Sequence, residues 1–304
     1  DRSLLFHDTH FTLNCMAKHQ TPESRLRTAL GNRGVSTATV RIFRKIIRDN
    51  YRENCREMPW RRSGDPYRVL VSEIMLQQTQ VERVLQKYGE FISAFPDIGS
   101  LARAPLSRVL RVWQGMGYNR RALSLKRLAE TVVREYDGRL PDVPEELVRL
   151  PGIGPYSAAA IYTFVHDRPS LLIETNIRRV YIHFFFNDRE AVRDAEIMPL
   201  IERTLDRKAP REWYYALMDY GVKLKKEVKN PNRRSIHYQK PSAFHGSTRQ
   251  ARGMVLRELL KTPGMTKAAL RKKIHAAPER IDRTLEALLK DHLIIRTGRR
   301  YSIP

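Results

Sequence analysis

Hydrophobic residues recur at a helical spacing of three to four positions from residue 38 to residue 229, and runs with the alternation of a β-strand are few. The connectors between these runs carry Pro, Gly and Asp, as in AFPDIGS and DGRLPDVP. The pattern therefore predicts a mainly α domain over 38–229. Its predicted helices cover residues 38–54, 66–80, 81–94, 106–114, 119–136, 144–149, 155–166, 176–186, 195–207 and 211–222.

The segments outside this domain follow other patterns. Residues 1–37 form an N-terminal extension of unassigned role, and the basic stretch over 230–250 reads as a linker. The last segment, 251–304, holds three short helical patterns (251–261, 266–275 and 279–290) and then LIIRTGRRYSI, whose two β-prone runs around a glycine predict a hairpin. Three helices followed by a hairpin are typical of a winged helix. Its third helix would place Arg280 and Arg283 in a DNA groove, although winged helices also serve protein contacts.

The charge of the chain points to a polyanionic partner. The 304 residues carry a formal net charge of +23, and residues 230–304 hold 17 Lys and Arg against 5 Asp and Glu, so half of the excess lies in the last quarter. Such clustering favours nucleic acid over a surface tuned only for solubility. A hydrophobic fraction of 41% argues against global disorder, and no apolar run approaches the length that crosses a bilayer.

The cysteine count limits the metal chemistry. Cys15 and Cys55 are the only cysteines, which excludes a four-thiolate cluster held by this chain alone and fits a reducing cytosol. The nine histidines have no ligand-like spacing, so we expect no metal site.

Glu73 lies in an apolar helical stretch, DPYRVLVSEIMLQQTQV. Val69 and Leu70 precede it by four and three positions, and Leu76 follows it by three, so its side chain lies on or beside the buried face. A carboxyl group placed there loses hydration, its pKa rises, and it can act as a general acid. A structural glutamate paired with an arginine fits the spacing equally well.

The stretch LPGIGP predicts a tight turn before a helix that begins near Pro155. Gly152 and Gly154 flank Ile153 and let the backbone approach a ligand closely. The free N–H groups of the following helix then suit a DNA phosphate. An ordinary turn can carry the same two glycines.

In LLIETNIRRVYIHFFF, Glu174 and Asn176 lie at the start of a predicted helix. An anion there is expected to be held ionised by the helix dipole, although a plain helix cap explains it as well. A protonated Glu73 and an ionised Glu174 would form a pair with opposite roles. Breaking an N-glycosidic bond needs both, because the departing base takes a proton and the sugar becomes cationic.

Five segments together resemble the helix-hairpin-helix DNA glycosylase superfamily, which includes endonuclease III-like enzymes, and most of all the MutY-type adenine glycosylases. They are MPWR…DPYRVLVSEIMLQQTQV, VWQGMGYNRRALSL, LPGIGPYSAAAI, IETNIRRV and LMDYGVKL, in the family's order and approximate spacing. The resemblance spans residues 58–222. It implies a helix-hairpin-helix glycosylase fold, with two helical subdomains flanking a cleft, to which the predicted winged helix is added.

The resemblance also implies residue roles. Glu73 would protonate the excised base, and Asn176 would help to position the catalytic water or carboxylate. Tyr156 stands where bifunctional relatives keep a lysine nucleophile, which implies an enzyme without a lyase step. The other implied contacts are the base-pocket edge at Met58, Trp60 and Arg61, the stack-invading residues Gln78 and Tyr118 with the neighbouring Thr79, and DNA contacts from the basic loop at Lys225, Arg233 and Arg234.

The sequence departs from the family at three places. The family's aspartate is Glu174 here, one methylene longer. The four-cysteine [4Fe–4S] loop is replaced by KLKKEVKNPNRRSIHYQKP, so we expect no iron–sulfur cofactor and a basic loop that keeps the phosphate contact. The usual 8-oxoguanine-recognising domain is replaced by the predicted winged helix.

The resemblance therefore implies a monofunctional DNA glycosylase of base-excision repair that hydrolyses the N-glycosidic bond of a flipped, mispaired base. Adenine opposite guanine or 8-oxoguanine is the expected target. A thymine or uracil glycosylase acting opposite guanine and a non-catalytic DNA-binding protein are the alternatives. The expected partner is double-stranded DNA with a mismatch or lesion, bound by a monomer without any membrane association, in the cytoplasm at the nucleoid or in a nucleus.

Overall fold

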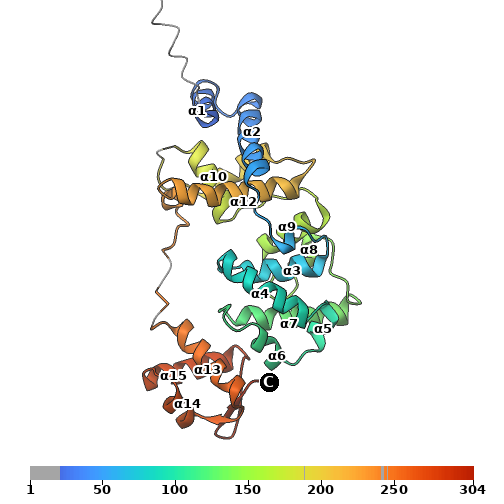
Figure 1. Cartoon of the computed structure of the whole chain (residues 1–304), viewed down its shortest axis with the longest axis vertical. Coiled ribbons are helices and arrows are strands. Elements are labelled where there is room, and N and C mark those ends of the chain that lie inside the picture. Colours follow the sequence, from blue (N-terminus) through green and yellow to red (C-terminus); the bar gives the residue numbers. More distant parts are fainter. Residues whose placement is uncertain (1–20, 188, 241–242, 245) are drawn as a thin grey trace, which may run out of the picture. The chain divides into compact units, whose positions relative to one another are not determined.

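The computed structural model describes residues 21–187, 189–240, 243–244 and 246–304. It is mainly helical and divides into two compact units, each built from two separate stretches of the chain. The first unit combines Asp1–Arg56 with Leu171–Tyr238, and the second combines Glu57–Ser170 with Gln239–Pro304 (Figure 1). No described helix is long and apolar enough to span a membrane.

The first unit is a bundle of helices around an aromatic core. Its elements are α1 (Pro22–Arg33), α2 (Thr37–Asn54), α10 (Thr175–Phe185), α11 (Asp194–Thr204), α12 (Pro210–Glu227) and the short 3₁₀ helix η2 (Pro231–Arg234). The ring of Phe43 on α2 meets Phe184 on α10 and Trp213 on α12 edge-on, with centroids 5.5 and 5.9 Å apart. Such edge-to-face contacts stabilise a core beyond the burial of area, so these three helices form the centre of the unit.

The second unit holds shorter helices around a larger hydrophobic core. Its first stretch contains η1 (Pro59–Arg61), α3 (Pro66–Leu76), α4 (Val81–Ala94), α5 (Ile98–Arg103), α6 (Leu106–Val112), α7 (Arg120–Glu135), α8 (Pro144–Leu147) and α9 (Pro155–His166). Helix α3 packs against α4, α7 and α9, and seven of its 11 residues are buried. This places α3 at the centre of the second unit.

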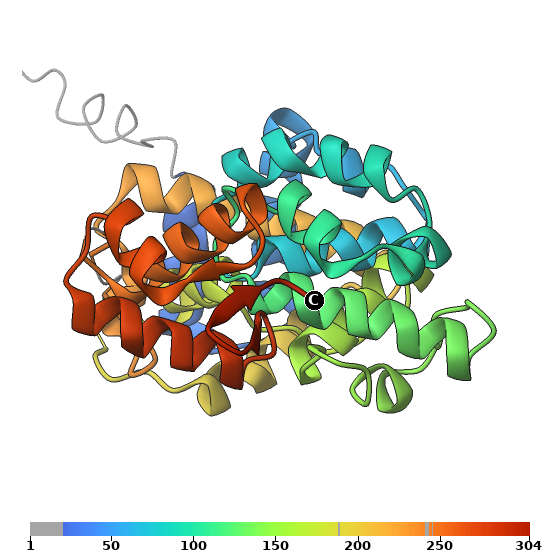
Figure 2. The same cartoon turned by 90° about the horizontal axis from the view of Figure 1, so that it is seen from below.

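The last residues form a C-terminal module of α13 (Thr248–Lys261), β1 (Met265–Thr266), α14 (Lys267–Lys273), α15 (Pro278–Lys290), β2 (Ile295–Thr297) and β3 (Arg300–Ser302). The strands form an antiparallel sheet in the order β1-β3-β2, with Thr297 opposite Arg300 across the turn at Gly298. The predicted hairpin is confirmed, and β1 is an additional strand. The module is the orange-to-red part of Figure 2. Its assignment as a winged helix stays a prediction.

Several predicted boundaries differ from the structure. Helix α3 ends at Leu76 instead of residue 80, because side-chain donors bind its last carbonyls and the chain turns sharply at Gln78. Helix α12 continues to Glu227, five residues into the segment that breaks the sequence pattern. Helices α1 and α5 and the 3₁₀ helix η2 were not predicted, the last lying inside the expected linker. Local periodicity carries no information about contacts made by distant side chains.

Candidate active site

Helix α3 carries Glu73 in its interior. Its first turn is fixed by Asp65, whose side chain accepts from the backbone N–H groups of Tyr67 and Arg68, and Pro66 occupies the first helical position, as the sequence predicts. Glu73 is partly buried, with buried Ser72 and Ile74 on either side. The predicted position at the edge of the apolar face is therefore confirmed, while the proton-donating role stays a prediction.

Arg121 at the start of α7 binds the C-terminal end of α3. Its guanidinium donates to the carbonyl oxygens of Ile74 (2.9 Å) and Met75 (2.8 Å) and to the Thr79 hydroxyl (2.9 Å). These carbonyls belong to the last turn of α3 and have no partner within the helix, so the arginine acts as a C-cap from another element. Burial lowers the pKa of Arg121 to about 10. Arg121 was not predicted as a site residue, although it lies in the matching motif VWQGMGYNRRALSL.

The same arginine supports the loop GMGYN, residues 115–119. Its guanidinium donates to the carbonyl oxygens of Met116 and Gly117 at 3.3 Å and lies 5.4 Å from the ring centroid of Tyr118. Arg121 thereby ties the end of α3 to the loop that carries Tyr118. Gln78 and Tyr118, both predicted to enter the base stack, have positive φ angles of 53° and 46°. Non-glycine residues in this region are strained, and such strain collects at functional sites.

The stretch LPGIGP forms the predicted turn. Gly152 has a φ of +82°, and a Cβ added there would lie 2.7 Å from Cβ of Ser124 on α7, so both the turn and the close approach require glycine. Gly154 is the N-cap of α9 and has no described atom within 4 Å of the place its Cβ would take. Ile153 is buried, so its predicted DNA contact can use only its backbone.

Helix α9 brings Tyr156 toward the end of α3. Tyr156 lies in the first turn of α9 and is partly buried. The next residue, Ser157, accepts a hydrogen bond of 3.3 Å from the side chain of Gln77 at the end of α3. The second unit therefore brings together the elements that carry Glu73, Gln78, Thr79, Tyr118 and Tyr156.

Glu174 and Asn176 form a cap at the start of α10 in the first unit. One carboxyl oxygen of Glu174 accepts from the backbone N–H groups of Asn176 (2.7 Å) and Ile177 (2.9 Å), and the other accepts from the Asn176 amide (3.2 Å). The predicted helix cap is confirmed. Burial nevertheless raises the pKa of Glu174, against the lowering by those N–H groups and by Arg179 and Arg178. The helix-dipole prediction had the opposite sign because it left desolvation out.

Arg179 extends this cap into a buried network. It is 3% exposed, and its guanidinium donates to the Asn176 side-chain oxygen (2.7 Å), the Gly221 carbonyl (2.7 Å) and the Asn230 side-chain oxygen (3.0 Å). Gly221 on α12 touches the same place, because a Cβ there would lie 2.4 Å from the Asn176 carbonyl oxygen. Neither Arg179 nor Gly221 was predicted, although both lie in the matching motifs IETNIRRV and LMDYGVKL.

The segment after α12 closes over α10 without cysteine. The Asn232 amide donates to the Thr175 carbonyl (2.7 Å), and Arg234 donates to the carbonyls of Ile182 and Phe186, both at 3.2 Å. A [4Fe–4S] cluster needs four thiolates, and a chain with two cysteines does not fit it. Side-chain amides and Arg234 hold this segment to α10, and the predicted DNA contact of Arg234 stays a prediction.

The remaining predicted contacts differ in exposure. Met58 and Trp60 are buried in the core of the second unit, where Trp60 lies edge-on to Tyr88. Both side chains therefore contribute to the packing of that core. Thr79 is partly buried and its hydroxyl is bound to Arg121. The side chains of Lys225, Arg233 and Arg283 are exposed, and those of Arg61 and Arg280 are partly exposed.

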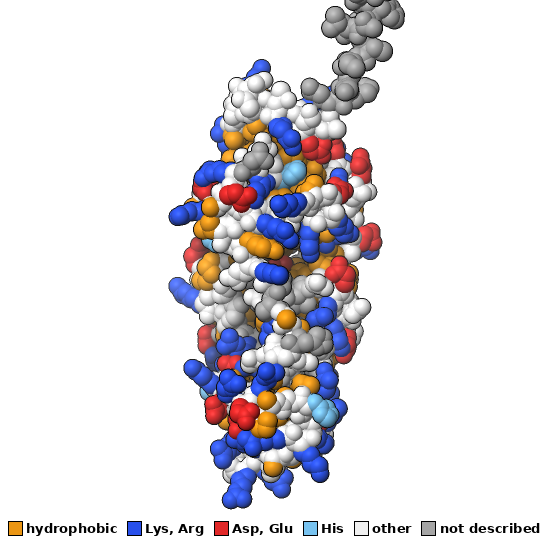
Figure 3. All heavy atoms as spheres, turned by 90° about the vertical axis from the view of Figure 1, so that its left-hand side faces the viewer, with side chains coloured by type: hydrophobic (Ala, Val, Ile, Leu, Met, Phe, Trp, Pro, Cys, Tyr) orange, Lys and Arg blue, Asp and Glu red, His pale blue; other side chains and the backbone are white. Residues whose placement is uncertain are grey.

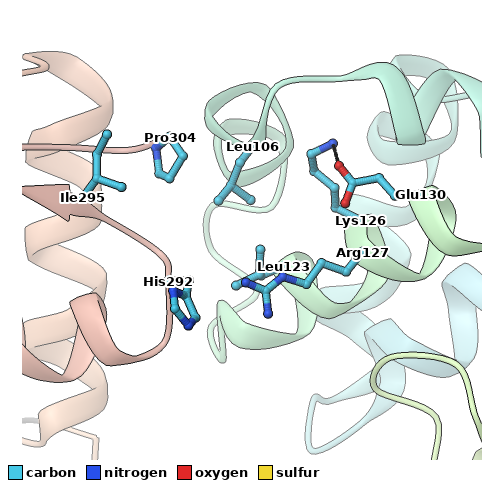
Figure 4. A pocket seen from close by; sticks show the side chains of 8 residues that line it. All are labelled: Leu106, Leu123, Lys126, Arg127, Glu130, His292, Ile295 and Pro304. Carbon is cyan, nitrogen blue, oxygen red and sulfur yellow. Dashed lines mark hydrogen bonds and ion pairs between the residues drawn. The ribbon is translucent and has the colours of Figure 1, made fainter.

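A separate pocket of about 320 Å³ lies in the second unit, and none of the residues that line it is a predicted site residue (Figure 4). It is lined by Leu106, Leu123, Lys126, Arg127, Glu130, His292, Ile295 and Pro304. Its lining combines helices α6 and α7 with the end of the C-terminal module. Within the described part of the chain, no group of three His, Cys, Asp or Glu residues is placed to hold a metal ion.

Glu73 belongs to the second unit, whereas Glu174 and Asn176 belong to the first. The pairing of the two carboxyl groups across a common cleft therefore stays a prediction. In the second unit, Arg121 binds the end of the helix that carries Glu73. In the first unit, Arg179 binds Asn176 at the start of α10, beside Glu174.

The chain matches proteins of known type. Residues 71–204 match the model of the HhH-GPD superfamily base excision DNA repair protein. The chain is 32% identical to the adenine DNA glycosylase of Mycobacterium tuberculosis over 281 residues, which cover 84% of this chain and 91% of that protein. It is 34% identical to the adenine DNA glycosylase of Buchnera aphidicola over 189 residues, which cover 60% of this chain and only 53% of that protein. A solved thermostable thymine-DNA glycosylase matches with a TM-score of 0.56 and 25% identity, over 63% of this chain and 90% of that one.

These matches include the segments that carry Glu73, Tyr156 and Glu174, and the mycobacterial relative is matched over nearly its whole length. The chain belongs to the HhH-GPD superfamily of base excision DNA repair proteins.

Proposed function

We propose that this protein is a monofunctional DNA glycosylase that removes adenine mispaired with guanine or 8-oxoguanine. The observation that carries the proposal is Glu73, a carboxyl group partly buried in an apolar helix whose end is fixed by Arg121. The choice of adenine is supported by the two relatives, both of which bear the name adenine DNA glycosylase.

In the proposed reaction, the protonated Glu73 carboxyl donates its proton to a ring nitrogen of the extruded adenine. The N-glycosidic bond then breaks, its electron pair leaves with the neutral base, and the deoxyribose becomes an oxocarbenium ion. Ionised Glu174 stabilises that cation, and a water molecule adds to the anomeric carbon and loses a proton to a carboxylate. The Asn176 amide, which donates to Glu174, fixes the orientation of the anion.

Tyr156 is the reason that we propose no lyase step. A lyase reaction needs an amine nucleophile that forms a Schiff base with the sugar, and a phenol cannot form one. The product is therefore an abasic site with an intact DNA backbone.

DNA binding rests on the charge and on the start of α9. Lys and Arg side chains gather at the lower end of the face in Figure 3, which the C-terminal module occupies. Gly154 leaves the approach to the N-terminus of α9 open, where free N–H groups suit a phosphate. Exposed Lys225 and Arg233 extend the basic surface of the first unit.

The substrate is tested with four duplexes that carry A:G, A:8-oxoguanine, T:G and U:G pairs, followed by alkali to cleave abasic sites. We expect cleavage of the adenine strand in the first two. The similarity to the thymine-DNA glycosylase makes thymine the second candidate, and cleavage of the T:G duplex alone would favour it. Binding without cleavage of any of the four duplexes would favour a non-catalytic DNA-binding protein.

The acid is tested by Glu73→Gln. This change keeps the size of the side chain and removes its proton, so we expect excision to fall by at least about 100-fold with little change in duplex affinity. The matched control is Glu82→Gln, on the exposed face of the neighbouring α4, which should leave the excision rate unchanged. Substantial turnover by Glu73→Gln would show that another group is the acid.

A further inference from the structure

The C-terminal module contacts the loop that carries Tyr118. Arg249 in the first turn of α13 donates to the Tyr118 hydroxyl at 2.6 Å, and its guanidinium carbon lies 5.5 Å from the centre of the same ring. Arg121 lies 5.4 Å from that ring. Two guanidinium groups from different elements therefore hold one tyrosine that is 38% exposed.

Other contacts fix the module next to this loop. Arg120, two residues after Tyr118, pairs with Asp291 of the module at 3.3 Å, and Asp291 also pairs with Arg252 on α13. Arg111 on α6 donates to the Leu260 carbonyl at the end of α13 at 3.3 Å. The hydrophobic core of the second unit also continues into the module without a break. The Arg249 contact is thus one of several that dock the module on α6 and α7.

The position of Tyr118 gives this contact a consequence for DNA. Its φ of 46° is unfavourable for tyrosine, and its ring and hydroxyl are contacted by Arg121 and Arg249. A charged donor to the phenol oxygen and a cation beside the ring both restrict its rotamers. Removing Arg249 leaves the inner support from Arg121 and frees the outer end of the ring.

We infer that Arg249 is a positioning residue: it orients Tyr118 for insertion into the duplex, which makes the C-terminal module part of the excision apparatus and more than a DNA tether. The inference rests on the proposed glycosylase function. It assigns to the module a role in extruding the target base, exerted through the phenol oxygen of one tyrosine.

The test uses the full chain with Arg249→Ala, Tyr118→Phe, the double variant and a control, Arg257→Ala, on the exposed side of α13. Single-turnover excision from an A:G duplex is measured alongside the fluorescence of 2-aminopurine at the target position, which rises as the base unstacks. We expect Arg249→Ala to lower both the rate and the fluorescence rise, the rate by about tenfold, as for one charge-assisted hydrogen bond.

Tyr118→Phe should have a similar effect because it removes the hydroxyl that Arg249 binds. The double variant should be no worse than the more severe single one, since both changes break the same contact. Additive losses, an unchanged Arg249→Ala, or a faster Arg249→Ala would each overturn the inference. If the native protein excises no base, the proposed function fails instead, and the fluorescence change on binding still decides the role of Arg249.

Discussion

Gly221→Ala tests how closely the start of α10 is fitted to α12. The added Cβ would lie 2.4 Å from the carbonyl oxygen of Asn176, 2.8 Å from its carbonyl carbon and 2.7 Å from its Cβ, whereas ordinary contact begins at 3.4 Å. The two helices must therefore separate by about 1 Å. The atoms in the way belong to the backbone and its Cβ, so no rotamer change relieves the overlap.

The separation would act on both stability and chemistry. Overpacking of this kind costs about 1–3 kcal/mol of unfolding free energy. The shift also stretches the hydrogen bonds from Arg179 to the Gly221 carbonyl and to Asn176, both 2.7 Å long. A misplacement of about 1 Å near reacting groups can lower a rate by about 100-fold. We therefore expect a loss of excision larger than the loss of folded protein explains.

The assay pairs thermal unfolding, followed by circular dichroism, with single-turnover excision at a temperature where the variant is folded. Gly31→Ala is the control in the same unit, because its Cβ would meet no described atom within 4 Å. Alanine there should raise the unfolding free energy by about 0.5–1 kcal/mol and leave the rate unchanged. A Gly221→Ala protein with native stability and native rate would refute the close packing and the inferred link from α12 to the cap.

Two further predictions concern the fixed ends of α3 and α10. Arg121→Lys should lower the unfolding free energy by about 1–3 kcal/mol and the excision rate by about tenfold, because one ammonium group cannot bind the α3 carbonyls and Thr79 together. Thermal unfolding and single-turnover excision measure the two effects. Arg127→Lys, on the exposed side of α7, is the control. Since burial raises the pKa of Glu174 and the ionised form is the active one, excision should increase with pH through a midpoint above the usual glutamate value of about 4.3. Glu174→Asp should remain active and Glu174→Gln should lose this acidic limb; a limb that persists in Glu174→Gln belongs to another group.

The sequence predicted the parts of the fold that local periodicity determines. The amphipathic helices α2, α4 and α7 were predicted to within one residue at each end. The turn at Gly152 was predicted from the conformational demands of glycine. These features depend on residues close together in the chain, which is the information that a single sequence carries.

The supports of the candidate site could not be predicted in the same way. Arg121 reaches carbonyls 44 to 47 positions away, and Arg179 binds a carbonyl 42 positions away. Each of these arginines lies inside a matching motif beside a second arginine, and only the tertiary fold shows which of the two is turned inward. The pKa direction of Glu174 was missed for a related reason, because desolvation depends on what packs around the carboxyl group.

The strain in the second unit indicates how the protein prepares for DNA. Left-handed backbone at Gln78 and at Tyr118 costs on the order of 1–3 kcal/mol for each residue. The hydrogen bonds from Arg121, together with the contact from Arg249, offset that cost. Contacts within the protein thus hold the residues proposed to enter the base stack in a strained conformation, and this support leaves little ordering of their backbone to oppose extrusion of the base.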